Sequence, residues 1–586
     1  MSDVEAARPR RPRRVLVEKS VTVPLRDGVK TYGDLYRPLG IGPVPAVVSR
    51  TPYNKEVAGQ GGGGLSPLKS AERGYAVLVV DTRGRASSEG EFRPFETEGP
   101  DGYDTVEWAA AQPWCDGNVA LHGGSYGGVT ALLGARERPS SLRCVIATST
   151  GDDYYDGWIF SGGAFQLGFA ATWTMTLAST SLILRPDYAS RVTLELQAEL
   201  RRTIAAGLEP LWTRPLSALP GVSAASIAPW WSTWLEHERR DGYWAGLSPS
   251  GHYDSFEVPI LHVGGWFDVF GTGAVRNYQG ITAAGRTDQL LVVGPWAHTE
   301  SGPALGEMTF GRTGAREAAD IVGETNRFLE RHLRPGVQAA PANSSPVRYF
   351  LMGANEWRLD SSWPPADARP LRLYLASGGK ANTLHGDGAL LEEPPTNGAG
   401  SDRYVYDPDR PVQTHGGPIV HMAIGPAGPL DQRRIEERDD VLCYTTPPLE
   451  QPVTVAGLVR ASLWAVSDCP DTDWTAKLVE VLPDGRAVSL CDGVIRARFR
   501  NSLEDPELLE PGRPERYEIT LGHVAHRFAA GHRVRLEISS SNFPRFDRNP
   551  NNGEPLGAAS QARIATQHVL HDESHRSHLE FDVLAE

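Results

Sequence analysis

Short apolar runs alternate with helix-like segments over the first 150 residues, and this alternation constrains the fold more than any other feature. Runs at residues 45–49, 75–80 and 119–123 are rich in Val, Leu and Ala. Continuous apolar runs of this length are typical of strands that are covered on both faces of a parallel sheet. Residues 101–112 carry apolar side chains at helical spacing between the last two runs. This part of the chain therefore predicts an α/β fold built from βαβ units.

The segment 152–250 has a different composition, because it favours helices and holds seven of the fifteen tryptophans. Strand-like runs then resume at residues 258–263 and 289–293. Loops of a rigid sheet tolerate insertions well. We therefore expect a helical insertion, residues 152–250, within one α/β domain made of residues 1–151 and 251–365.

Beyond residue 366 the chain consists of strand-like runs separated by Pro, Gly and Asp turns, with hardly any amphipathic helix. Residues 366–586 therefore predict an all-β domain, a β-sandwich of jelly-roll type. Residues 1–15 are basic and lack the apolar stretch of an export signal, so they predict a disordered tail. Four consecutive glycines in residues 60–64 predict a mobile loop.

Charge and cysteine content exclude several classes of function. The chain has 58 Lys and Arg against 72 Asp and Glu, a formal charge of −14, which argues against nucleic acid as a partner. We see no apolar run near the ~18 residues of a membrane span, so no membrane association is expected. The five cysteines contain no CxxC pair, which argues against a metal site. They are typical of a reduced, cytoplasmic protein.

The strongest sign of chemistry is the sequence Gly-Gly-Ser-Tyr-Gly-Gly at residues 123–128, between a predicted strand and a predicted helix. Gly-x-Ser-x-Gly in this setting is the nucleophile elbow of α/β hydrolases, where flanking glycines permit a turn too tight for Cβ atoms. The serine hydroxyl then lies at a helix N-terminus, whose partial positive charge favours an alkoxide. Ser125 is therefore the candidate nucleophile, although a plain glycine-rich turn would show the same pattern.

A serine nucleophile needs a base, and the base needs an orienting carboxylate. The runs at 258–263 and 289–293 lead into Asp268 and His298, in the chain order Ser, Asp, His of α/β hydrolases. Both would lie at carboxyl ends of strands, where open α/β sheets bind ligands. His122 and His262 lie within strand-like runs, so we expect them in the core.

Nearby carboxylates offer a weaker candidate site. Asp152, Asp153 and Asp156 follow a strand end and could receive a cationic substrate, but a loop or helix cap is the simpler interpretation.

The motifs at Ser125, Asp268 and His298 resemble those of the bacterial cocaine esterase family, which is related to X-Pro dipeptidyl peptidases, α-amino-acid ester hydrolases and glutaryl-cephalosporin acylases. Further matching stretches span nearly the whole chain, at residues 27–29, 81–84, 114–119, 439–443 and 539–544. The resemblance implies a hydrolase domain, a helical cap and a jelly roll with the active site between them.

The resemblance also implies an oxyanion hole and an acyl pocket. The family uses a tyrosine hydroxyl after the first core strand and the amide that follows the nucleophile, which correspond here to Tyr53 and Tyr126. In cocaine-esterase-type members aromatic cap residues line the acyl pocket, and Trp158, Trp173 and Phe270 correspond by rough position. A carboxylate that helps α-amino-acid ester hydrolases to hold an ammonium group is replaced here by Gly128, which puts that specialisation in doubt.

We therefore predict a serine hydrolase that cleaves small carboxylic esters through an acyl-enzyme, without metal or cofactor. The same prediction extends to amide substrates. An X-Pro dipeptidyl peptidase or a β-lactam acylase with the same triad is the alternative within the enzyme class. A carbohydrate-binding protein on a non-catalytic hydrolase scaffold is the alternative from another class. The sequence does not determine the oligomeric state, and both a monomer and a homo-oligomer stay open.

Overall fold

The computed structural model describes residues 13–58, 65–286, 288–334, 345–396, 400–420 and 424–585. The predicted glycine loop at 60–64 and residues 1–12 of the predicted tail lie outside this range. Val15 already begins the first strand, so the predicted tail ends before residue 15.

Contacts between Cα atoms divide the chain into two compact units. The first comprises Met1–Ala147, Ser255–Ile260 and Val322–Ala340, and the second comprises Thr148–Asp254, Leu261–Ile321 and Pro341–Glu586. The domain boundaries expected from the sequence stay a prediction.

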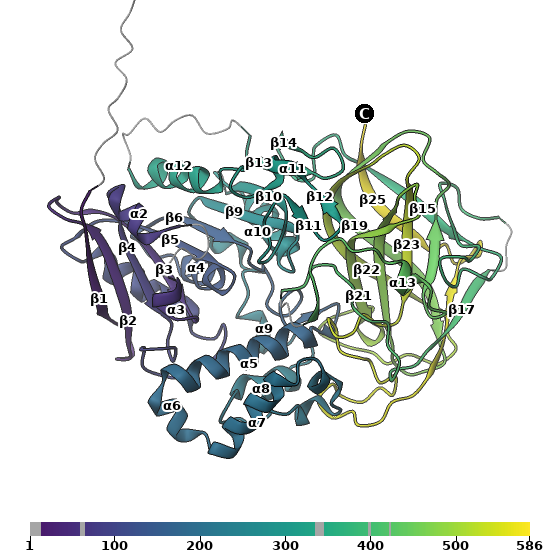
Figure 1. Cartoon of the computed structure of the whole chain (residues 1–586), viewed down its shortest axis with the longest axis horizontal. Coiled ribbons are helices and arrows are strands. Elements are labelled where there is room, and N and C mark those ends of the chain that lie inside the picture. The colour runs from purple at the N-terminus through teal and green to yellow at the C-terminus, as the bar shows by residue number, and fades with distance from the viewer. Residues whose placement is uncertain are drawn as a thin grey trace, which may run out of the picture. The chain divides into compact units, whose positions relative to one another are not determined.

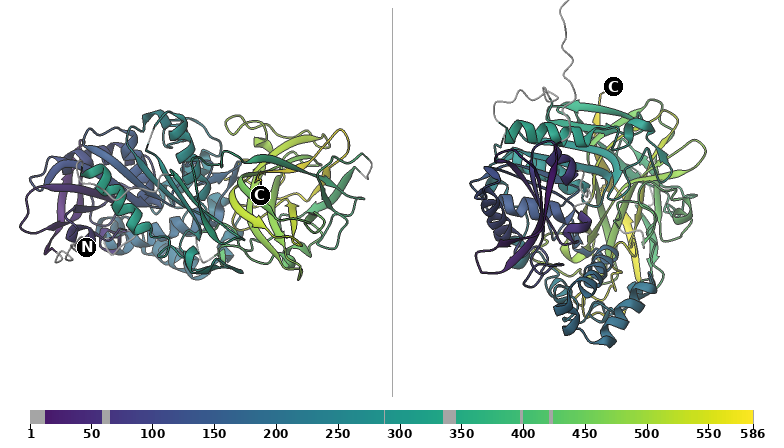
Figure 2. Two further views of the ribbon diagram at one scale, coloured as in Figure 1. Left: turned by 90° about the horizontal axis from the view of Figure 1, so that it is seen from above. Right: turned by 60° about the vertical axis from the view of Figure 1, so that its left-hand side comes forward.

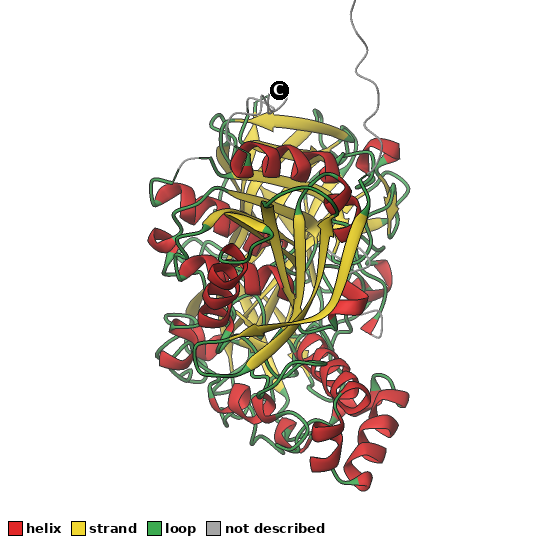
Figure 3. Cartoon of the chain, turned by 90° about the vertical axis from the view of Figure 1, so that its left-hand side faces the viewer, coloured by secondary structure: helices red, strands yellow, loops and turns green. Residues whose placement is uncertain are grey.

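The first unit is built on a sheet whose strands are yellow in Figure 3 and whose strand order is β1-β2-β4-β3-β5-β6 (Figure 1). Strand β3 pairs in parallel with both β4 and β5, whereas β2 pairs antiparallel with both β1 and β4. Every residue of β4 is buried, as expected for a strand covered on both faces. The strands are β1 (Val15–Pro24), β2 (Lys30–Pro38), β3 (Val44–Thr51), β4 (Ala76–Asp81), β5 (Cys115–Gly124) and β6 (Leu142–Thr148).

Two helices of this unit position the candidate nucleophile. The predicted helix at 101–112 is present as α3 (Glu98–Ala110), and α4 (Tyr126–Arg136) begins directly after Ser125. The two helices approach closely because Gly102 faces Gly134, where a Cβ atom would lie 2.7 Å from the Gly134 Cα. The remaining helices here are α1 (Lys55–Ala58), α2 (Pro67–Glu72) and α12 (Ile321–Leu333).

The second unit begins with the segment that the sequence predicted to be helical, and its helices gather in one group (Figure 1). A short hairpin precedes them, formed by β7 (Phe160–Ser161) and β8 (Ala164–Phe165). The helices are α5 (Leu167–Leu184), α6 (Pro186–Arg191), α7 (Leu194–Ala205), α8 (Pro229–Glu236) and α9 (Gly242–Ala245). Most of the tryptophans in this segment are buried, which explains their concentration there.

Helix α5 was not anticipated as an apolar span, because threonines and serines interrupt its sequence. Among the described residues it is the one helix whose length and composition would suffice to cross a membrane. However, 67% of it is buried inside the protein, which is typical of a helix packed in a protein core.

The second unit next contributes parallel strands that carry the other candidate catalytic residues. Strand β9 (Ile260–Phe267) pairs in parallel with β10 (Leu290–Ala297), and α10 (Gly271–Ala283) connects them. Strand β10 also pairs in parallel with β13 (Val347–Leu351). Shorter elements complete this part: β11 (Ala304–Leu305), β12 (Met308–Thr309), α11 (Gly311–Gly314) and β14 (Glu356–Asp360).

An eleven-stranded sheet fills the rest of the described chain (Figure 2, green to yellow). Its order is β17-β24-β19-β25-β15-β16-β18-β23-β20-β21, and β22 pairs with β19. Its pairs are antiparallel except for one bridge between β16 and β18. The strands are β15 (Arg369–Ala376), β16 (Ala389–Leu391), β17 (Ser401–Tyr406), β18 (Leu442–Thr445), β19 (Val453–Ser467), β20 (Asp473–Val481), β21 (Ala487–Arg496), β22 (Glu515–Phe528), β23 (Arg533–Ser539), β24 (Ala565–Leu570) and β25 (His578–Leu584), with the short helix α13 (Arg433–Glu436) before β18.

Candidate active site

The turn between β5 and α4 has the geometry expected of a nucleophile elbow. Ser125 is the single residue between the strand and the helix, with φ of 56° and ψ of −126°. Residues other than glycine rarely adopt this backbone conformation. The glycine before the turn is required, because a Cβ atom on Gly123 would lie 2.0 Å from the Gly127 carbonyl oxygen. Such strain persists only where the surrounding structure enforces it, and it clusters at active sites.

Asp268 and His298 meet at the carboxyl ends of the parallel strands β9 and β10. Phe267 is paired with Ala297 in the register of the two strands, so the residues that follow them lie side by side. His298 Nδ1 is 3.0 Å from Asp268 Oδ1, and the Phe270 amide donates to the same oxygen at 2.9 Å. The Asp268 side chain is fully buried, and the His298 side chain is 9% exposed. This is the arrangement in which a carboxylate fixes the ring of a histidine base.

The electrostatics of this pair suit a base held beside an anion. Burial raises the pKa of Asp268, but the charge of His298 and the hydrogen bonds outweigh burial and leave that pKa below its usual value. Burial lowers the pKa of His298, but the neighbouring Asp268 carboxylate outweighs it, so the pKa of His298 is raised above 6.5. Each partner thus favours the charged form of the other.

The three aromatic residues assigned to the acyl pocket lie in one cluster. The rings of Trp158 and Phe270 stack with centroids 3.9 Å apart, and Trp173 meets Trp158 edge-on at 6.0 Å. Phe270 also contacts the ring of His298 edge-on at 5.2 Å. Sequence reasoning missed Phe169, which stacks on Trp173 at 5.6 Å and lies one helical turn before it. The cluster therefore extends from α5 to the candidate base.

The other histidines that were expected in the core are buried, which confirms that expectation. His122 is 3% exposed and contacts Ser49, while His262 is 1% exposed and contacts Gln289. Burial lowers the pKa of His262 to about 4, so this ring is neutral at pH 7.

The carboxylates after β6 are held by partners of the protein itself. Asp153 pairs with Arg240 at 2.8 Å, and Asp156 lies 3.6 Å from Arg276. Burial raises the pKa of Asp152 to about 7, although Arg276 opposes that rise. The contact with Arg240 supports the structural interpretation for Asp153, whereas Asp152 and Asp156 line a cavity, so for them that interpretation stays a prediction.

A cavity of about 340 Å³ in the second unit lies beside Asp268. Its lining includes the start of the helical segment with Asp152, helix α10 with Arg276, strands β21 and β22 of the large sheet, and Arg545 from the connection between β23 and β24. Trp158, Trp173 and Phe270 are not among its described lining residues, so their place in an acyl pocket stays a prediction.

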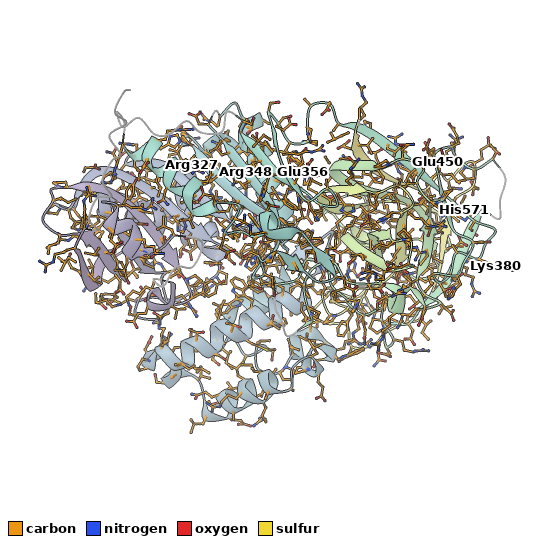
Figure 4. All side chains as sticks on the ribbon, turned by 45° about the horizontal axis from the view of Figure 1, so that its top comes forward. Arg327, Arg348, Glu356, Lys380, Glu450 and His571 are labelled. Atoms are coloured by element: carbon orange, nitrogen blue, oxygen red, sulfur yellow. The ribbon has the colours of Figure 1, made fainter. Side chains whose placement is uncertain are left out.

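A second grouping of serine, histidine and aspartate lies in the large sheet but cannot relay a proton. His571 (labelled in Figure 4) uses one ring nitrogen, Nε2, for both Ser377 Oγ at 3.1 Å and Asp402 Oδ2 at 3.0 Å. A triad requires opposite nitrogens for the nucleophile and the carboxylate. Tyr444 donates to the same carboxylate at 2.7 Å, so this grouping is a buried structural cluster.

Of the predicted residues, the structure thus brings Asp268 next to His298 and gathers the aromatic three. In the first unit, Ser125 and Tyr126 are consecutive at the elbow, and Tyr53 follows the end of β3 by two residues.

Comparison with protein families matches most of the chain in two stretches. Residues 27–300 match the X-Pro dipeptidyl-peptidase (S15) family, and residues 339–580 match the X-Pro dipeptidyl-peptidase C-terminal non-catalytic domain. These matches assign the α/β fold to the N-terminal part and the all-β fold to the C-terminal part, as predicted.

Individual relatives cover the chain from end to end. A cocaine esterase from Rhodococcus sp. is 37% identical over 97% of this chain and 98% of its own length. The crystal structure of an aminopeptidase from a marine sediment archaeon, Thaumarchaeota archaeon, has a TM-score of 0.80 and 26% identity, and covers 100% of this chain and 99% of its own. An α-amino acid ester hydrolase has a TM-score of 0.78 and 26% identity, with full coverage of both chains.

Proposed function

The chain belongs to the family of serine ester hydrolases that contains bacterial cocaine esterase, and we propose that Ser125, His298 and Asp268 are its catalytic triad. The observation that carries this proposal is the hydrogen bond between Asp268 and His298 at two adjacent strand ends. The strained elbow at Ser125 supplies the nucleophile that such a pair would serve.

In the proposed mechanism Ser125 Oγ attacks the ester carbonyl while His298 Nε2 accepts its proton. Asp268 holds the imidazole through Nδ1 and stabilises the charge that develops on it. His298 then returns the proton to the leaving alcohol, which leaves an acyl-enzyme. Water activated by the same histidine hydrolyses that intermediate. These steps use only side chains, backbone and water.

We further propose that the Tyr53 hydroxyl and the Tyr126 amide bind the oxyanion. Tyr126 is the first residue of α4. The amides in the first turn of a helix have no acceptor within the helix, so they are left to donate to other groups. Two fixed donors aimed at the developing charge each contribute about 3–4 kcal/mol to transition-state binding.

The remaining assignments follow from the family and the composition. Residues 152–250 act as a helical cap over the site, and residues 366–586 form a jelly roll. We also propose that Trp158, Trp173 and Phe270 form the acyl-binding side of the substrate site, next to His298, which suits a small ester with an aromatic or branched acyl group. We propose that the protein acts in the cytoplasm. We also keep the homo-oligomer that the sequence left open.

Amide hydrolysis is the second candidate activity. It is supported by the similarity in fold to an archaeal aminopeptidase over the whole chain. Assays of p-nitrophenyl esters beside X-Pro anilides and acyl cephalosporins separate the two activities. Turnover of anilides alone would reject the esterase assignment.

The decisive experiment replaces the nucleophile. Ser125→Ala should abolish ester turnover and labelling by a fluorophosphonate probe while leaving the melting temperature near that of the unchanged protein. Ser377→Ala is the matched control, because it removes the serine of the structural cluster and should retain both activity and labelling. Labelling that survives in Ser125→Ala and disappears in Ser377→Ala would overturn the triad.

A further inference from the structure

A buried ion pair in the first unit joins strand β3 to helix α3. Arg50 Nη2 lies 2.8 Å from Glu98 Oε2, and Arg50 Nη1 donates to the Glu98 carbonyl oxygen at 2.8 Å. Their side chains are 1% and 3% exposed. Removing one partner of such a buried pair leaves an uncompensated charge, which is strongly destabilising.

The partner is the tyrosine that follows the candidate nucleophile. The Tyr126 hydroxyl donates to the other carboxylate oxygen of Glu98 at 3.1 Å and accepts from the Phe95 amide at 2.8 Å. The ring of Tyr126 packs against Phe92 and Phe95, with centroids 5.8 and 5.6 Å away. Because Tyr126 is fully buried, its hydroxyl holds protein groups and does not reach a substrate.

The same network reaches the strand end that precedes Tyr53. Arg50 is the penultimate residue of β3, and its carbonyl oxygen accepts from Thr130 Oγ1 of α4 at 3.1 Å. The backbone that carries Tyr53 and the backbone that carries the Tyr126 amide are thus tied to each other through Arg50.

We propose that Arg50, Glu98 and the Tyr126 hydroxyl are positioning residues that fix the two oxyanion donors and enforce the strained backbone at Ser125. The inference rests on the proposed function. The ring of Tyr126 and the proposed donor amide belong to the same residue, so a side chain held at its hydroxyl also restricts the backbone of that residue. Anchoring the hydroxyl therefore limits how far that amide can move, which is the preorganisation that oxyanion binding needs.

The test replaces Tyr126 by phenylalanine, which removes the hydroxyl and keeps the ring and the amide. Loss of a whole oxyanion donor costs ~10²–10³-fold in kcat, so a misplaced donor should cost about 10-fold. KM should stay within about twofold, because the ground-state contacts are unchanged. The inhibition constant of phenylboronic acid, whose serine adduct carries a tetrahedral anion, should rise by about the same factor as kcat falls.

Tyr75→Phe is the matched control, since Tyr75 is a buried tyrosine of the same unit that lies outside this network. It should leave kcat and the inhibition constant unchanged. A purely structural role of the network would lower the melting temperature of Tyr126→Phe without changing kcat or boronate affinity, and that result would overturn the proposal.

Glu98→Gln provides a second variant in case Tyr126→Phe does not fold. The amide oxygen can still accept from Tyr126, but the attraction to Arg50 is weakened, so kcat should fall with KM kept. Unchanged kcat and boronate affinity in Glu98→Gln would also refute the positioning role. Failure of the proposed function is seen separately, as a wild-type protein in which the fluorophosphonate leaves Ser125 unlabelled.

Discussion

Replacing Asp268 by asparagine isolates the charge of the carboxylate from its hydrogen bonds. One oxygen, Oδ1, receives both His298 Nδ1 and the Phe270 amide. An asparagine that places its carbonyl oxygen there keeps both contacts and the orientation of the ring. What it loses is the negative charge beside the imidazolium that forms during acylation.

The size of the effect follows from the distance between the Asp268 carboxylate and the His298 ring, whose atoms Oδ1 and Nδ1 are 3.0 Å apart. Charges about 4 Å apart interact by about 4 kcal/mol at an effective dielectric constant of about 20. Since each 1.36 kcal/mol is about tenfold in rate, kcat/KM should fall by about 10³-fold. This is less than the ~10⁴-fold loss seen where an asparagine also imposes the wrong histidine tautomer.

The pH profile gives an independent readout of the same substitution. His298 must be neutral to act as a base, and the Asp268 carboxylate raises its pKa above 6.5. The acid limb of kcat/KM should therefore lie above pH 6.5 in the unchanged protein. In Asp268→Asn the carboxylate no longer opposes burial, which lowers the pKa of His298, so the limb should move to lower pH.

Kinetics of ester hydrolysis from pH 4 to 9 check both expectations. Asp241→Asn is the matched control, because Asp241 lies 2.7 Å from His237 in another aspartate–histidine pair and is not among the described lining residues of the cavity beside Asp268. It should leave the rate and the profile unchanged. An acid limb that stays in place in Asp268→Asn, or a loss of tenfold or less, would refute the electrostatic role of Asp268.

Two further predictions concern the elbow and the aromatic cluster. Gly123→Ala places a Cβ atom 2.0 Å from the Gly127 carbonyl oxygen, so fluorophosphonate labelling should be lost, whereas Gly242→Ala, with open space around it, should be labelled normally. Trp158→Ala removes a ring stacked 3.9 Å from Phe270, which should lower the free energy of unfolding by about 3–5 kcal/mol and raise KM for bulky acyl esters. Denaturant titration and steady-state kinetics measure these effects, and an unchanged KM for all acyl groups would remove Trp158 from the acyl pocket.

The strands of the α/β part were predictable because burial on both faces leaves a continuous apolar run. The run at 75–80 corresponds to β4 (Ala76–Asp81) within one residue at each end. The hairpin β1–β2 escaped notice because β1 is largely exposed and carries charged residues such as Glu18 and Lys19 among its apolar ones. Edge strands of this kind lack a continuous apolar run, because many of their side chains face water and are polar.

The candidate site was predictable where chemistry and chain direction coincide. Asp268 and His298 each follow a strand-like run, and parallel strands bring such ends to one edge. The Arg50–Glu98–Tyr126 network was not predictable, because its members are far apart in the sequence and belong to no motif. Only packing shows that the Tyr126 ring turns toward α3.

The contrast between the two groupings of serine, histidine and aspartate shows why residue types alone do not define a catalytic site. Asp268 and His298 follow parallel neighbours, so the aspartate meets the ring at Nδ1 and Nε2 is directed away from the carboxylate. Asp402 lies in a strand that pairs antiparallel with the strand preceding His571, and there the carboxylate and the serine both meet Nε2. The ring nitrogen that meets the carboxylate therefore decides whether the opposite nitrogen is left for a nucleophile.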